Sequence, residues 1–208
     1  MDSISSYKNR ALASLKGNWE KGILATFLYF IGTGGLSFVP TLFVNGDEAQ
    51  FTSSILSIVF LILILPFEWG MVVYFLAIAR GEDNNIGKLL DGYNAFKKVA
   101  FTKLLVKIFT FLWTLLLIIP GIVKFYSYSM TDYILRDEAD LAYDAAIERS
   151  MAMMKGHKMD LFLLHLSFIG WAILCVCTFG FGFLFLIPYV YTAQAHFYED
   201  LKAEFQSA

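Results

Sequence analysis

Charged side chains are scarce in this chain and missing from long stretches of it. Asp, Glu, Lys and Arg make up only 16% of the 208 residues, whereas hydrophobic side chains make up 58%. A soluble domain carries about 25% charged residues. Residues 22–44 hold no charge, and residues 53–79 hold only Glu68. Because lipid tails cannot solvate charge, apolar runs of this length indicate membrane spans. The sequence therefore predicts an integral membrane protein.

Cysteine and catalytic motifs are also sparse. Cys175 and Cys177 lie in an apolar run, at a spacing that matches neither a redox motif nor a zinc knuckle. We interpret them as packing residues. No GxSxG or HExxH pattern occurs, and we expect a protein that is not an enzyme and holds no metal and no cofactor. The formal net charge of -2 gives no sign of a nucleic-acid partner.

The apolar residues gather in five regions, at residues 22–44, 53–79, 104–135, 159–178 and 181–198. The third region is too long for one straight span and short for two. Pro120-Gly121 lies near its middle, and this dipeptide breaks or turns a helix, which favours a hairpin. Residues 179–182 supply a tight turn between the last two regions.

Three amphipathic segments precede the predicted hairpins, at residues 4–16, 86–99 and 137–158. In the first, Tyr7, Ala11 and Leu15 recur at helical spacing, so we expect a helix that lies on the membrane surface. In the third, we expect Asp140 to cap the start of a helix and Gly156 to end it.

Charge placement decides between six spans and five. With six spans, every Lys and Arg except Lys124 falls on one side of the membrane, which the positive-inside rule identifies as the cytoplasm. With residues 104–135 as one span, the block that holds Arg149, Lys155 and Lys158 would be exported. We therefore prefer six spans, and we keep five as the alternative. Both termini then lie in the cytoplasm.

The predicted fold is an all-α polytopic membrane bundle that forms a single domain over residues 1–208. Its six spans form three hairpins, with three cytoplasmic amphipathic helices at the membrane interface. A weak internal repeat divides the chain into units at 1–80, 81–136 and 137–208. Each unit would consist of a surface helix, an outward span and an inward span.

Several stretches carry a family resemblance. They are ALASLKGNW at 11–19, AIERSM at 146–151, MKGHK at 154–158, LSFIGW at 166–171, IPY at 187–189 and AHFY at 195–198. These stretches resemble a bacterial integral membrane family of unknown function, the domain-of-unknown-function family nine-seven-five. The resemblance implies a multi-pass protein of the bacterial cytoplasmic (inner) membrane. It implies no activity.

Polar residues within the predicted spans are the first candidate site: Glu68, Lys124, Tyr128, Asp132, His165 and His196. Glu68 precedes Arg80 by about 18 Å at 1.5 Å per helical residue, near the middle of a core about 30 Å thick. It could serve a proton or cation site, or pair with Lys124 between two hairpins. Lys124 could instead extend its ammonium to the outer surface. Tyr128 and Asp132 share a helix face and could line a cavity or bond neighbouring helices.

Residues of the surface helices are the second candidate site, for lipid or a partner: Lys8, Arg10, Lys16, Trp19, Arg149, Lys155 and Lys158. Our leading hypothesis is a non-enzymatic membrane scaffold or accessory subunit that binds anionic lipid or a partner membrane protein. The alternative is a small transporter or permease for a lipid-like or small solute. The alternative would lead if Glu68, Asp132 and Tyr128 lined one water-filled cavity.

Overall fold

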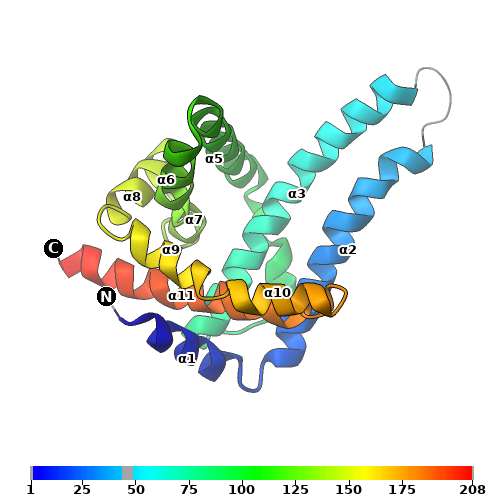
Figure 1. Cartoon of the computed structure of the whole chain (residues 1–208). Coiled ribbons are helices and arrows are strands. Elements are labelled where there is room, and N and C mark those ends of the chain that lie inside the picture. Colours follow the sequence, from blue (N-terminus) through cyan, green and yellow to red (C-terminus); the bar gives the residue numbers. More distant parts are fainter. Residues whose placement is uncertain (1, 44–48, 208) are drawn as a thin grey trace.

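The computed structural model describes residues 2–43 and 49–207, and within them the chain is helical and has no strand. Figure 1 shows helix pairs that extend from a base where the two termini lie. In chain order the elements are α1 (Ile4–Leu15), α2 (Trp19–Phe43), α3 (Ala49–Arg80), η1 (Ile86–Leu90), α4 (Asp91–Asn94), α5 (Phe96–Leu116), α6 (Ile118–Tyr128), α7 (Thr131–Asp137), α8 (Tyr143–Met153), α9 (Lys158–Leu166), α10 (Ile169–Cys177) and α11 (Phe183–Ser207).

The first amphipathic helix, α1, forms as its periodicity predicts. Ser3 caps it through a hydrogen bond from the Ser6 amide, and Gly17 follows its end at a φ of 86°. Its buried face consists of Tyr7, Ala11 and Leu15. This face packs against α11, where the Tyr7 ring lies 5.5 Å from that of Phe197. The apolar stripe predicted to rest on lipid is thus covered by the protein itself.

The second amphipathic segment differs from its prediction. Residues 86–99 do not form one helix but a 3-10 turn, the short α4 and the start of α5. They pack against α3 at two glycines: a Cβ on Gly70 would lie 2.0 Å from the Leu89 carbonyl oxygen, and one on Gly92 would lie 2.3 Å from that of Pro66. Backbones can approach this closely only where side chains are absent. Close backbone packing therefore replaces the regular helix expected here.

Residues 104–135 form a helical hairpin and not one continuous helix. The chain reverses at the extended residue Leu117, and α5 and α6 then pack side by side. The reversal lies before Pro120, which occupies the first turn of α6, where its missing N–H costs nothing. A Cβ on Gly121 would lie 2.6 Å from Thr114 Cα. The predicted dipeptide thus starts the second helix, while the turn itself precedes it.

A break between α6 and α7 is closed by a side chain from α8. The Ser150 hydroxyl donates to the Ser127 carbonyl at 2.9 Å and accepts from the Met130 amide at 3.2 Å. Ser150 is fully buried, so it satisfies backbone groups that could not reach water. The start of α8 differs from the prediction, because Ala142 and not Asp140 occupies the N-cap position. Gly156, at a φ of 97°, follows the helix as expected.

The last helix pair is joined by the turn predicted at residues 179–182. Phe179 and Gly180 have φ values of 53° and 89°, and the Gly180 amide donates to the Cys175 carbonyl at 3.0 Å. Cys175 is buried where Gly182 approaches it, whereas Cys177 is exposed, and both are free thiols. The predicted packing role is therefore confirmed for Cys175.

Three described stretches are long and apolar enough to cross a membrane: Ser54–Arg80, Phe96–Leu116 and Lys158–Cys177. The third stretch bends where α9 meets α10. The protein is thus all-helical with three candidate spans. The helices meet in a core near the termini, to which α1, α3, α7, α8 and α11 contribute buried side chains.

The contact between α3 and the turn before α4 gives a test of the fold. Gly70→Ala should lower the unfolding temperature in detergent, because the new methyl group meets backbone atoms, and overpacking costs about 1–3 kcal/mol. Gly34→Ala is the matched control, since a Cβ there meets no atom within 4 Å. Equal unfolding temperatures for the two variants would contradict the close packing of α3 on residues 86–94.

Candidate functional site

Four charged side chains from three helices form one ion-pair cluster. The Lys103 ammonium of α5 lies 2.7 Å from Asp132 Oδ2 of α7 and 3.8 Å from Glu68 Oε2 of α3. Lys107 lies one turn further along α5, and its ammonium is 3.0 Å from Glu68 Oε1. Two positive and two negative charges balance, which lowers the cost of holding them in apolar surroundings.

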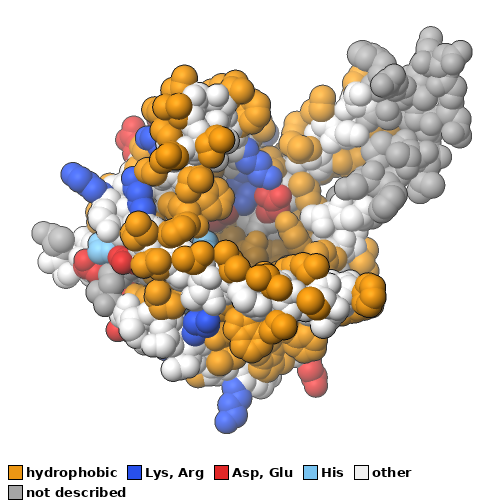
Figure 2. Space-filling model, in the orientation of Figure 1, with side chains coloured by type: hydrophobic (Ala, Val, Ile, Leu, Met, Phe, Trp, Pro, Cys, Tyr) orange, Lys and Arg blue, Asp and Glu red, His pale blue; other side chains and the backbone are white. Residues whose placement is uncertain are grey.

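The cluster lies beside a cavity of about 580 Å³ that we call the central cavity. Its walls come from α5, α6, α7, α9 and α11, and from Val72 of α3. The polar lining includes Lys103, Lys107, Tyr128, Ser129, Thr131, Asp132, His165, Tyr191 and Gln194. Figure 2 shows basic and acidic side chains in a hollow that is framed by hydrophobic ones.

The cavity retains unused hydrogen-bonding capacity. The Lys107 side chain is 47% exposed, so its ammonium keeps donors free beside its bond to Glu68. Thr131 lines the cavity and is 2% exposed, yet its hydroxyl has no hydrogen-bond partner among the described residues. Buried polar groups are almost always bonded to protein or to water. The site is therefore equipped to bind water or a polar ligand.

The structure contradicts the predicted pair between Glu68 and Lys124. Glu68 pairs with Lys107 and Lys103, whereas the Lys124 ammonium lies 5.1 Å from the Trp113 ring centre and 5.9 Å from that of Tyr128. The prediction failed because it counted both α5 lysines as charges at the membrane surface. Aromatic faces rather than a carboxylate accommodate Lys124.

The remaining intramembrane candidates divide between two places. Tyr128, Asp132 and His165 line the central cavity together, whereas Glu68 does not line it and only pairs with lysines that do. His196 does not reach it, because its ring bonds the Ser14 hydroxyl of α1 at 2.9 Å. Among the residues that the structure describes, no three His, Cys, Asp or Glu side chains are grouped as a metal site requires.

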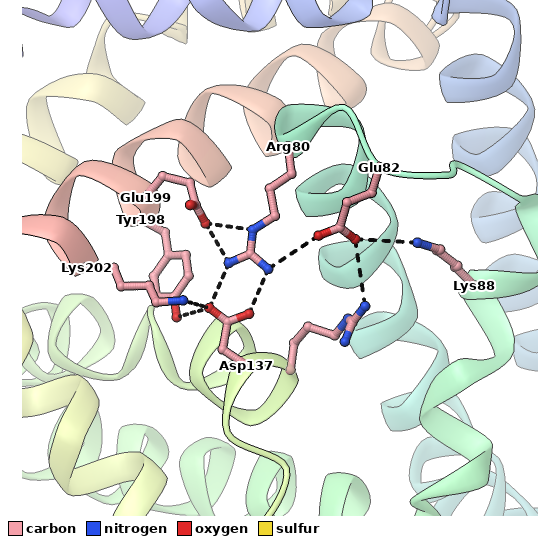
Figure 3. Close-up of polar contacts among 8 residues, drawn as sticks. Arg80, Glu82, Lys88, Asp137, Tyr198, Glu199 and Lys202 are labelled. Atoms are coloured by element: carbon pink, nitrogen blue, oxygen red, sulfur yellow. Dashed lines mark hydrogen bonds and ion pairs between the residues drawn. The ribbon is translucent and has the colours of Figure 1, made fainter.

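A second ion-pair network closes the base of the bundle, as Figure 3 shows. Arg80 donates to both oxygens of Asp137, at 2.8 and 2.7 Å, and to Glu199, at 2.9 and 2.7 Å. Tyr198 and Lys202 donate to the same Asp137 carboxylate. Because these residues come from α3, α7 and α11, the network joins three helices.

The predicted lipid or partner surface is partly occupied by contacts within the chain. Arg10 pairs with Asp200 at 2.7 Å, and Arg149 pairs with Glu138 at 3.0 Å. The Lys8 ammonium donates to the Ser167 carbonyl and lies over the Phe168 ring. Within residues 2–43 and 49–207, the ammonium groups of Lys16, Lys155 and Lys158 form no ion pair, and Trp19 packs against Phe185.

Comparison with known families confirms the resemblance seen in the second half of the sequence. A family model described as "Protein of unknown function (DUF975)" matches residues 115–204. The match runs from the end of α5 into α11 and includes Tyr128, Asp132 and His165 of the cavity wall. No curated protein and no solved structure matches this chain. Residues 115–204 of this all-helical chain thus match a family that is described only as having an unknown function.

Sequence reasoning missed Lys103 and Lys107 as site residues. Both lie within an apolar helix at positions i and i+4, a spacing that puts them on one face. That spacing was the available signal, since two lysines on one face of a span need a shared partner. Thr131 belongs to the polar stretch at residues 126–133 that also holds Tyr128 and Asp132, whereas no pattern pointed to Gln194, which reaches the cavity only through the tertiary arrangement.

The base network makes stability depend on pH. Burial alone would raise the pKa of Asp137, but hydrogen bonds from Arg80, Lys202 and Tyr198 outweigh it and hold the pKa at about 2, below the ordinary 3.8. A depressed pKa stabilises the fold above about pH 4, and this contribution of about 2 kcal/mol should disappear as the pH falls from about 4 to about 2. Unfolding midpoints in detergent across this range measure it.

The Asp137→Asn variant should unfold at a lower temperature than wild type at neutral pH and should lose most of the change between pH 4 and 2. Asp144→Asn is the control, because the exposed Asp144 carboxylate accepts only from the neighbouring Ala145 amide. If Asp137→Asn kept the full acid dependence of wild type, another group would be responsible for it.

Proposed function

We propose that this chain is a small transporter or permease of the bacterial cytoplasmic membrane, which binds a small or lipid-like solute in the central cavity. The observation that carries this proposal is the Lys103 ammonium, shared by Asp132 and Glu68 beside an open polar cavity. The arrangement favours transport over a scaffold because the paired charges border a cavity that further polar side chains line.

The depth of the charged cluster supports the proposal. Glu68 belongs to the candidate span Ser54–Arg80, and both lysines belong to Phe96–Leu116. At 1.5 Å per residue, Glu68 lies about 18 Å from Arg80, near the middle of a core about 30 Å thick. An ionised group at this depth costs at least about 3 kcal/mol unless it is paired or hydrated. Such groups mark solute and ion pathways in membrane proteins.

Six spans in three hairpins remain the proposed topology, with both termini and the three amphipathic segments on the cytoplasmic side. The chain reversal at Leu117 supports one of the hairpins, whereas the turn at residues 179–182 lies beside α1 and the start of α2, since Gly182 lines the same hollow as Leu12 and Trp19. The proposed first turn, at residues 45–50, lies mostly outside the described residues. The distribution of Lys and Arg supports the orientation.

A non-enzymatic scaffold or accessory subunit that binds anionic lipid or another membrane protein is the second candidate. It is favoured by the basic surface near the end of α8, where Lys155 is exposed and Lys158 is half-buried, and neither forms an ion pair among the described side chains. Unpaired lysines at a membrane interface attract anionic lipids or an acidic partner.

Single cysteines in a cysteine-free background test the topology. An impermeant thiol reagent applied to intact cells should label position 48, which lies outside the described residues. Positions 84, 139 and 207 should react only after the membrane is opened, because they lie in the cytoplasm in this topology. Labelling of position 139 in intact cells would support five spans.

Thermal stabilisation by ligands tests transport. Purified protein would be heated with a panel of small polar solutes and short-chain lipid-like amphiphiles. At least one class should stabilise wild type, by about 2.7 kcal/mol when present at 100 times its Kd. Gln194→Leu should reduce this effect, because it removes a polar side chain from the lining of the cavity.

Asp144→Asn is the control and should respond to the ligand as wild type does. Any stabilising compound should also leave protein-containing liposomes faster than protein-free ones. Stabilisation with no added flux would favour the scaffold, and a panel without any stabilising compound would count against the cavity as a binding site.

A further inference from the structure

A second hollow lies beside α10 and the start of α11, and we call it the apolar groove. It has a volume of about 390 Å³ and lies between α1, the start of α2, α10 and the start of α11. Its lining includes Leu12, Trp19, Trp171, Leu174, Cys175 and Phe185. It shares no lining residue with the central cavity. The groove is therefore a separate site, independent of the proposed transport function.

The groove has a fixed floor and an open side. Cys175 is buried at its floor, where Gly182 approaches too closely for any larger residue to fit. The Trp19 ring lies 6.3 Å from that of Phe185 and closes one end. Trp171 and Leu174 of α10 remain more than half exposed along the open side. Figure 2 shows hydrophobic side chains along α10 and α11. A narrow apolar trough of this kind suits a flexible hydrocarbon chain.

A basic residue lies close in the sequence to two of the lining residues. Lys16 directly follows α1, between the lining residues Leu12 and Trp19, and is exposed. Its ammonium forms no ion pair with the described part of the chain, whereas Arg10 on the same helix is neutralised by Asp200. The Trp19 indole beside it is a side chain typical of the headgroup level of a bilayer. An exposed ammonium group thus lies near an apolar groove, as the charged headgroup of a phospholipid lies next to its acyl chains.

From this arrangement we infer that the apolar groove binds one acyl chain of an anionic phospholipid, whose phosphate lies at Lys16. The apolar wall supplies most of the affinity, and the ammonium supplies the preference for a negative headgroup. A lipid in this position joins α1 to α10 and so stabilises the packing of the first helix on the last helix pair.

Native mass spectrometry of delipidated protein in detergent tests the inference. The probes are phosphatidylglycerol and phosphatidylcholine with identical acyl chains. Wild type should bind the first at least fivefold more tightly. Lys16→Gln should weaken phosphatidylglycerol binding about fivefold, which corresponds to about 1 kcal/mol per basic residue, and leave phosphatidylcholine unchanged. Lys97→Gln removes an exposed ammonium at the start of α5, which does not line the groove, and should behave as wild type.

The groove itself is tested by filling it. Leu174→Trp places an indole in the groove and should weaken both lipids about tenfold. Val176→Trp is the matched control, because Val176 lies on the same helix, is 67% exposed and does not line the groove. Equal binding of both lipids by wild type would overturn the headgroup assignment. Equal binding by the two tryptophan variants would overturn the groove and leave only general lipid contact.

The proposals for the central cavity and for the apolar groove can be tested independently. Gln194→Leu alters the central cavity and should leave phosphatidylglycerol binding unchanged, since no cavity residue touches the groove. Loss of lipid binding in that variant would contradict the independence of the groove. Capture of an acidic protein by Lys16 in place of lipid would also contradict the inference, because the apolar groove would then remain unused.

Discussion

The rest of the structure depends on the pairing of Lys103, which lies between Asp132 and Glu68. An ammonium group inside an apolar bundle is costly unless carboxylates surround it. The two carboxylates come from α7 and α3, so the pairing fixes where the α5–α6 hairpin lies against the long helix of the first hairpin. The hairpin held in this way leaves the central cavity between it and α11. The pairing of Lys103 thus determines both where the cavity lies and which charged groups lie beside it.

The same constraint operates at the base. Arg80, Asp137 and Glu199 end α3, α7 and the apolar part of α11, and each satisfies the others. This network does not line the central cavity, whereas the cluster at Lys103 is open to the cavity on one side. We regard the base as the structural element and the open cluster as the functional one. The difference between them is access to the cavity, since both are built from the same residue types.

Most of the helices could be predicted from the sequence, because apolar runs, glycines and helical spacing report local structure. The buried face of α1, the reversal within residues 104–135 and the turn at 179–182 were all readable in this way. The partner of Glu68 was not readable. In a membrane helix the lipid-facing and interior-facing side chains are equally apolar, so the spacing of Lys103 and Lys107 places both on one face of α5 but does not show that this face meets Glu68. Depth along a helix can be predicted from a sequence, whereas the direction in which a side chain points cannot.

The central claim is that the cavity beside Lys103 is accessible to water, and cysteine modification at two neighbouring positions tests it most directly. Thr110 lines the cavity, whereas Phe109, next to it on α5, is exposed on the outer surface of the bundle and does not line it. In cysteine-free protein in lipid nanodiscs, Thr110→Cys should react with a charged methanethiosulfonate reagent at least about tenfold faster than Phe109→Cys, because thiolate formation needs water. Equal or negligible rates at both positions would show a dry interior and contradict the account.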